Sequence, residues 1–180
     1  MRTQRLFALA GLFLLGLAPV FAQTAEVIIV KDIDARGDTP AYYSLRTNSL
    51  VDVAQKDTDA WDVSFSGTNI RLNPKGQGAF LQDAFDDVAE VPAQGLKKDE
   101  TGSTVIPGGS DQGWYNYDFM THSITPVPER TLIVQTPEGA FAKLEILSYY
   151  QGELDDPNTI GEPRFYSFRY ILLPEGTTAF

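Results

Sequence analysis

The sequence of 180 residues contains no cysteine, and this absence excludes several kinds of chemistry at once. Without a thiol there is no disulfide bond, no thiolate ligand for a metal and no cysteine nucleophile. A lipid attached through a cysteine side chain is excluded as well. We therefore expect a domain that is stabilised by its hydrophobic core and is not lipid-anchored.

Histidine and methionine are almost as scarce as cysteine. His122 is the only histidine, and Met120 is the only methionine besides Met1. A lone histidine can act as a general base, but the sequence has no Gly-x-Ser-x-Gly motif and no nucleophile spaced to act with it. Acidic residues are so numerous that pairs of carboxylates arise by chance. We therefore expect a binding protein and no enzymatic activity.

A possible calcium loop is incomplete. Asp32 and Asp34 begin the pattern, but Arg36 places a cation at the fifth position. The twelfth position is Tyr43, where a calcium loop requires glutamate. The pattern does not predict a calcium site.

Basic residues are also few. The chain has 14 Lys and Arg against 24 Asp and Glu, and two of the basic residues, Arg2 and Arg5, lie in the N-terminal segment. Without that segment the net charge is −12. Such a surface repels nucleic acids and anionic membranes, so we expect no nucleic-acid partner.

The longest apolar run lies at the N-terminus. Residues 6–20 (LFALAGLFLLGLAPV) follow two arginines and precede the small residue Ala22. This pattern predicts a signal peptide at residues 1–22, and the run is shorter than the roughly 20 apolar residues that span a bilayer. We expect no integral membrane segment after cleavage and a soluble periplasmic or secreted protein. Residues 23–180 then form one domain, which can bury about two-thirds of its unfolded surface.

Strand patterns dominate the remaining sequence. Residues 131–136 and 140–150 are joined by three residues ending in Gly139, which predicts a hairpin with a positive φ at this glycine. Alternation in the second run places Ala142, Leu144 and Ile146 on one face, opposite Lys143 and Glu145.

The C-terminal run, residues 164–173, alternates in the same way and places Tyr166, Phe168 and Tyr170 on one face. Further strands are predicted at 26–33, 42–47, 61–65 and 70–72, whereas residues 82–88 form one turn of helix at most. Strands separated by Gly, Pro, Asn and Asp predict an all-β, antiparallel-rich domain of two sheets, sandwich-like and with little helix.

Two polar stretches, residues 97–113 and 152–163, are predicted to be loops. The aromatic residues Trp114, Tyr115 and Tyr117 directly follow the first loop, where they are candidates to line the mouth of an apolar pocket. The alternative is that these aromatic side chains fill the core, as they do in most strands.

Four stretches in order carry a family resemblance, and residues 165–170 (FYSFRY) complete it. They are 43–48 (YSLRTN), 61–73 (WDVSFSGTNIRLN), 114–126 (WYNYDFMTHSITP) and 130–150 (RTLIVQTPEGAFAKLEILSYY). Together they resemble the HmuY-like proteins, exported haem-binding proteins of Gram-negative bacteria. The resemblance covers nearly the whole chain after the signal peptide. It implies an all-β fold of two sheets, capture of haem and transfer of haem to an outer-membrane receptor.

In that family a pair of histidines or a pair of methionines holds the haem iron, and this sequence can supply neither pair. The resemblance leaves His122 or Met120 as an axial ligand, with a tyrosine phenolate as the second ligand or a five-coordinate iron. Residues two positions apart on a strand share a face, so we expect that His122 and Met120 do not grip opposite faces of the ring. Arg130 and Lys143 are the candidate cations for the haem propionates, and no metal besides haem iron is expected.

The sequence as a whole predicts an exported binding protein for haem or a related tetrapyrrole. The missing second ligand favours an alternative on the same fold, in which the domain binds another apolar ligand or another exported protein. In that case His122 is a packed, structural residue.

Overall fold

The computed structural model describes residues 26–156 and 161–180, and the predicted signal peptide lies outside these ranges. Within them the chain forms strands and one short 3₁₀ turn, η1 (Val53–Gln55), and no α-helix. The strands are β1 (Ile28–Asp34), β2 (Ala41–Ser44), β3 (Ser49–Val51), β4 (Val63–Ser66), β5 (Asn69–Leu72), β6 (Gln77–Leu81), β7 (Tyr115–Asp118), β8 (Ser123–Pro126), β9 (Thr131–Gln135), β10 (Phe141–Tyr150) and β11 (Pro163–Leu172). No helix in the described ranges has the length and apolarity that crossing a membrane would need.

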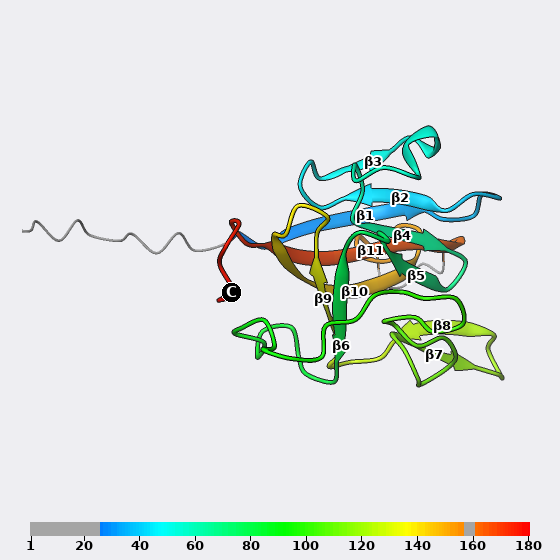
Figure 1. Cartoon of the computed structure of the whole chain (residues 1–180). Helices are drawn as coiled ribbons and strands as arrows, with labels where there is room; N and C mark the ends of the chain where they lie inside the picture. The colour runs from blue at the N-terminus through cyan, green and yellow to red at the C-terminus, as the bar shows by residue number, and fades with distance from the viewer. Residues whose placement is uncertain (1–25, 157–160) are drawn as a thin grey trace, which may run out of the picture.

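The strands form two main sheets and one separate ribbon (Figure 1). The five-stranded sheet has the order β1-β11-β10-β9-β6, and the four-stranded sheet has the order β3-β2-β4-β5. Every neighbouring pair is antiparallel. The prediction of an all-β, antiparallel domain of two sheets is therefore confirmed, and the ribbon β7–β8 is an addition to it.

The core lies between the two sheets, and the alternation in the sequence explains which side chains fill it. The predicted inward residues of β10 and β11 are all buried there. From the opposite sheet, Phe65 lies with its ring centroid 4.6 Å from Tyr166 and 5.4 Å from Phe168. Tyr43 meets the Phe168 ring edge-on at 5.4 Å. Aromatic pairs of this kind each add about 0.5–1.5 kcal/mol to the stabilisation that burial provides.

Two glycines, Gly139 and Gly78, occupy positions in the five-stranded sheet that suit this residue. Gly139 has φ +99° in the turn between β9 and β10, as predicted. Strand β6 was not predicted, because Gly78 interrupts its strand pattern. A Cβ atom at Gly78 would lie only 2.2 Å from the Ile133 carbonyl oxygen, so glycine is required for β6 to pair with β9.

The outer face of the five-stranded sheet is covered by the chain itself, which overturns the proposed role of Lys143. Its Nζ donates to the carbonyl oxygens of Phe85 and Val88, at 2.8 Å each. It also lies 4.6 Å and 5.1 Å from the ring centroids of Phe85 and Phe180. The side chain is buried, and burial lowers the pKa of Lys143. This ammonium group is a structural contact beneath the C-terminus and is out of reach of a surface ligand.

Candidate functional site

The candidate ligands and the candidate pocket aromatics lie on one hairpin, whereas the two candidate cations do not. Strands β7 and β8 pair from Tyr115↔Pro126 to Asp118↔Ser123, and residues 119–122 form the turn between them. Trp114 and Tyr115 lie at the base of this hairpin, whereas Tyr117, Met120 and His122 lie at or beside its tip. Figure 1 shows the hairpin set beside the two main sheets.

The base of the hairpin is anchored in the core. Trp114 is only 3% exposed, and its Nε1 donates to the Thr68 carbonyl oxygen at 2.9 Å. Its ring centroid lies 5.2 Å from that of Tyr166 and 5.1 Å from that of Tyr115. Tyr115 is half-buried and packs against the same core. Trp114 is therefore a core anchor and does not present its ring at the mouth of an open pocket.

The second strand of the hairpin is held by Tyr150 on β10. The Ile124 amide donates to the Tyr150 hydroxyl oxygen at 2.9 Å. Ile124 and Tyr150 both pack against the main core as partly buried residues. The hairpin is thus held to the core on both of its strands, at Trp114 at the base and at Ile124 further along β8.

The turn at the tip is built by Asp118. Its Oδ1 accepts hydrogen bonds from the amides of Met120 at 2.7 Å and Thr121 at 3.2 Å, the arrangement that makes Asp common in turns. These bonds hold the pKa of the Asp118 carboxyl group below its usual value. His122 closes the turn with φ +57°, a conformation that few residues other than glycine adopt. His122 therefore lies in a turn, and the expectation that it shares a strand face with Met120 was wrong.

The tip exposes apolar and ligating side chains together. Phe119 is 77% exposed and Met120 is 90% exposed, both unusual for large hydrophobic residues. The Tyr117 ring meets Phe119 edge-on at 5.0 Å. The Tyr117 hydroxyl lies 2.7 Å from Nδ1 of His122, which leaves Nε2 as the ring nitrogen without a partner among the described residues. When a hydrogen bond at one ring nitrogen fixes the orientation of a histidine, the other ring nitrogen is available to bind a metal or to form another hydrogen bond.

Arg130 is not part of this arrangement. It follows the end of β8, on the side of the base, and the length of β8 alone separates base from tip by about 13 Å. Its Nη1 donates to the Glu129 carbonyl oxygen at 3.3 Å, and its buried Nε has no partner in the described residues. The structure brings neither predicted cation, Arg130 or Lys143, to the candidate ligands.

Other metal sites are not assembled in the described part of the chain, where no group of three or more His, Asp or Glu side chains could hold an ion. In the incomplete calcium loop, Arg36 pairs with Asp34 at 2.8 Å. This hydrogen bond lowers the pKa of Asp34.

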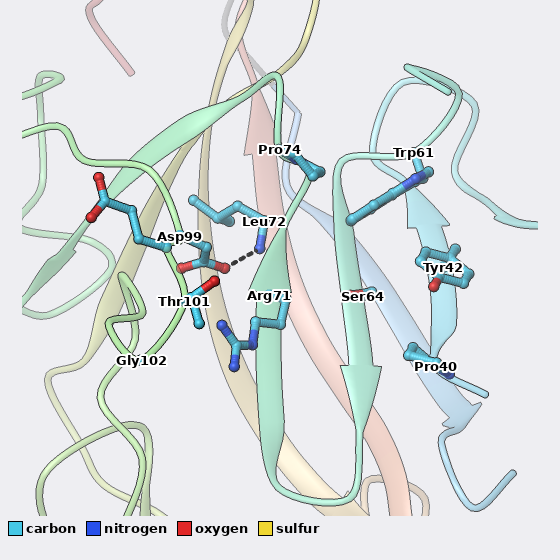
Figure 2. A pocket seen from close by; sticks show the side chains of 11 residues that line it. Pro40, Tyr42, Trp61, Ser64, Arg71, Leu72, Pro74, Asp99, Thr101 and Gly102 are labelled. Carbon is cyan, nitrogen blue, oxygen red and sulfur yellow. Dashed lines mark hydrogen bonds between the residues drawn. The ribbon is translucent and has the colours of Figure 1, made fainter. Parts of the chain in front are cut away.

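A groove, which the sequence did not reveal, lies on the outer face of the four-stranded sheet (Figure 2). It has a volume of about 530 Å³ and is lined by residues that include Tyr42, Trp61, Ser64, Arg71 and Asp99. Tyr42, Ser64 and Arg71 form a row across three strands, because β2 pairs Tyr42 with Ser64 and β5 pairs Arg71 with Ser64. Only the strand register reveals this row, so the separate strand patterns could not have predicted it.

One wall of this groove is the loop that contains Asp99. Its Oδ2 accepts a hydrogen bond from the Leu72 amide at 2.8 Å, which Figure 2 shows as a dashed line, and its Oδ1 accepts one from the Val105 amide at 2.6 Å. On the opposite side the Trp61 and Tyr42 rings meet edge-on at 4.8 Å. The groove therefore combines aromatic rings with the exposed guanidinium group of Arg71.

Comparison with known proteins identifies the family. The family model described as HmuY protein matches residues 38–170, most of the chain. The chain belongs to the HmuY family. This match includes the whole four-stranded sheet and the whole β7–β8 hairpin, whereas β1 of the five-stranded sheet precedes it. No curated protein matches the chain.

Several solved bacterial proteins have a similar fold. An apo HmuY analog from Tannerella forsythia is 18% identical with a TM-score of 0.53, over 85% of this chain and 100% of that chain. A candidate HmuY-like heme-binding protein from Bacteroides vulgatus is 18% identical with a TM-score of 0.52, over 82% and 91%. A candidate lipoprotein from Bacteroides fragilis is 17% identical with a TM-score of 0.58, over 84% and 93%. At these identities the likeness establishes a shared fold.

The donor set of this HmuY family member fits one face of a haem. Imidazole and thioether are both axial ligands that haem iron accepts, and the exposed Phe119 supplies apolar surface beside them. A flat ring gripped between Met120 and His122 would have to cross the backbone at Thr121. A single hairpin tip could therefore supply an axial ligand on one side of the iron only.

Proposed function

We propose that this protein is exported and binds haem or a related tetrapyrrole at the tip of the β7–β8 hairpin, with Nε2 of His122 as the axial ligand. The observation that carries the proposal is the Tyr117–His122 contact of 2.7 Å, which orients an exposed imidazole in a turn that rests on an anchored base. Membership of the HmuY family supports it.

Each residue of the tip has a distinct role in this proposal. In the tautomer that the proposal needs, Nδ1 of His122 carries the proton and donates a hydrogen bond to the Tyr117 hydroxyl oxygen, so that the Nε2 lone pair faces the ligand. Phe119 provides an apolar surface for the ring, and Asp118 holds the turn through the Met120 and Thr121 amides. Haem iron, when bound, supplies the Lewis acid that the imidazole coordinates.

The proposal extends to the setting of the protein. The signal-peptide pattern of residues 1–22 supports export to the periplasm or beyond, in a soluble form. The absence of cysteine supports a form without a cysteine-linked lipid, unlike the candidate lipoprotein from Bacteroides fragilis. The protein would act as a carrier that hands its ligand to an outer-membrane receptor, and not as an enzyme.

A haem titration of the mature protein, residues 23–180, tests the proposed ligand. We expect a saturable shift of the Soret band for the unaltered protein and its loss in His122→Ala. Met120→Leu, which keeps the size and apolarity of the side chain, is the matched control and should retain the shift. An unchanged spectrum in His122→Ala would refute the role of His122.

A second variant tests the orientation of the imidazole. Tyr117→Phe removes only the hydroxyl group that contacts Nδ1. Loss of such an outer partner typically weakens metal binding about 10–100-fold, and we expect a loss in this range with an unchanged far-UV circular dichroism spectrum. Equal affinity in the variant would show that Tyr117 does not position the ligand.

The groove of Figure 2 supports the alternative function, in which the same fold binds a non-haem ligand. Its volume of about 530 Å³ lies in the range of small-molecule sites, and no His or Met lines it. If haem produces no Soret shift, a Tyr42→Ala variant tests the groove, because it removes one of the two rings that meet edge-on there. Ligands from bacterial extracts that the unaltered protein retains and Tyr42→Ala loses would favour this alternative.

A further inference from the structure

The chain contains one histidine, whereas bis-histidine coordination of a haem requires two. One histidine and one methionine follow the predicted signal peptide, and cysteine is absent. Both candidates lie within the same turn, on the two sides of Thr121. A second axial ligand of the histidine type must therefore come from outside the chain.

The position of the tip allows a second chain to supply that ligand. The tip residues 118–122 are all exposed, and the rest of the hairpin is held to the core through Trp114 and through the contact of Ile124 with Tyr150. The ring face that His122 does not cover is thus open to another molecule. Phe119 and Met120, 77% and 90% exposed, offer apolar contacts that a single copy leaves in water.

We infer that two copies of this chain share one haem, each contributing Nε2 of its His122 to one face of the iron. This inference rests on the proposed function, since it concerns the same ligand and the same histidine. Two-fold symmetry is the natural arrangement, because the same tip then meets the ring from both sides. The exposed Phe119 and Met120 of both copies would be covered around the ring.

The charge of the protein predicts how this dimer responds to salt. Each mature chain carries a net charge of −12, so two copies repel one another at low ionic strength. Salt screens this repulsion. We expect the haem-linked dimer to become more abundant as the salt concentration rises, whereas axial coordination itself is largely insensitive to salt.

The experiment combines a Soret titration with a mass measurement by analytical ultracentrifugation on the mature protein. We expect saturation at one haem per two chains, a doubling of the mass when haem is added, and the spectrum of low-spin, bis-histidine iron. His122→Ala should stay at the mass of the apo protein, and Leu50→Ala, at an exposed residue of β3 outside the hairpin, should still double. Iron-free protoporphyrin IX should cause no doubling, because it takes no axial ligands.

The possible outcomes separate this inference from the function on which it rests. A shifted Soret band with one haem per chain and an unchanged mass would overturn the shared haem and leave haem binding in place. Doubling with iron-free protoporphyrin would also overturn it, because apolar stacking would then be the cause. The absence of any Soret shift would overturn both proposals.

Discussion

The base and the tip of the β7–β8 hairpin differ in burial although they lie on the same short ribbon. At the base, Trp114 is 3% exposed and its indole nitrogen is hydrogen-bonded inside the protein. At the tip, Phe119 is 77% exposed, and the nearest aromatic partner is another residue of the hairpin, Tyr117. Aromatic residues at the base stabilise the fold, whereas those at the tip contribute little to it and are free to contact a ligand.

The largest expected difference in stability is between two variants that each remove one aromatic ring, one at the base of the hairpin and one at its tip. Trp114→Ala should lower the free energy of unfolding by about 3–5 kcal/mol, because it leaves a cavity in the core and an unpaired Thr68 carbonyl group. Phe119→Ala should change it by no more than about 0.5 kcal/mol, as is usual for exposed side chains. Urea unfolding followed by far-UV circular dichroism measures both. Equal losses would show that the tip is part of the core.

A smaller effect is expected from removing the hydroxyl group that holds the hairpin to β10, compared with removing the hydroxyl group within the hairpin itself. Tyr150→Phe deprives the Ile124 amide of its acceptor and should lower the free energy of unfolding by about 1 kcal/mol. Hydrogen exchange at the Ile124 amide should become faster. Tyr117→Phe is the matched variant at the tip and should leave this exchange rate unchanged. If Tyr150→Phe has no effect on exchange at Ile124, β8 is not held through this contact.

The smallest effect is a dependence of the tip on pH. Because the folded protein lowers the pKa of Asp118, the ionised carboxylate favours the ordered turn above the ordinary value of about 3.9. This contribution is lost as the pH falls through the lowered pKa. The amide NMR signals of Met120 and Thr121 should therefore shift in acid before that of Ile124 does. Asp118→Asn should abolish this response, and a simultaneous shift of all three signals would contradict the local origin.

The sequence predicted the main sheets well because their faces alternate. The alternation in β10 and β11 identified the inward side chains, and Gly139 identified the turn before β10. The prediction from sequence failed where tertiary contacts override the local pattern. Gly78 lies in a paired strand because only glycine fits against Ile133, and Lys143 is buried because a distant segment covers it.

The candidate site was predicted in part. The composition alone selected His122 and Met120, and the aromatic run selected Tyr117 beside them. The turn was missed, although Asp118 two positions before Met120 is a typical turn signal. Trp114 was assigned to a pocket because sequence cannot tell a buried aromatic residue from one at a pocket mouth. The separation of Arg130 from the tip and the row of Tyr42, Ser64 and Arg71 could not be predicted, since both depend on how the strands are arranged in the fold.

Asp99 has a consequence for how the protein behaves in a crowded compartment. Strand β5 is an edge of its sheet, and the amide of Leu72 faces outward, where a strand from another molecule would pair with it. The Asp99 carboxylate occupies that donor and places a negative charge along the edge. The folded protein thus has a built-in protection against sheet-to-sheet aggregation at this edge, although it has no disulfide bond to keep its strands in place.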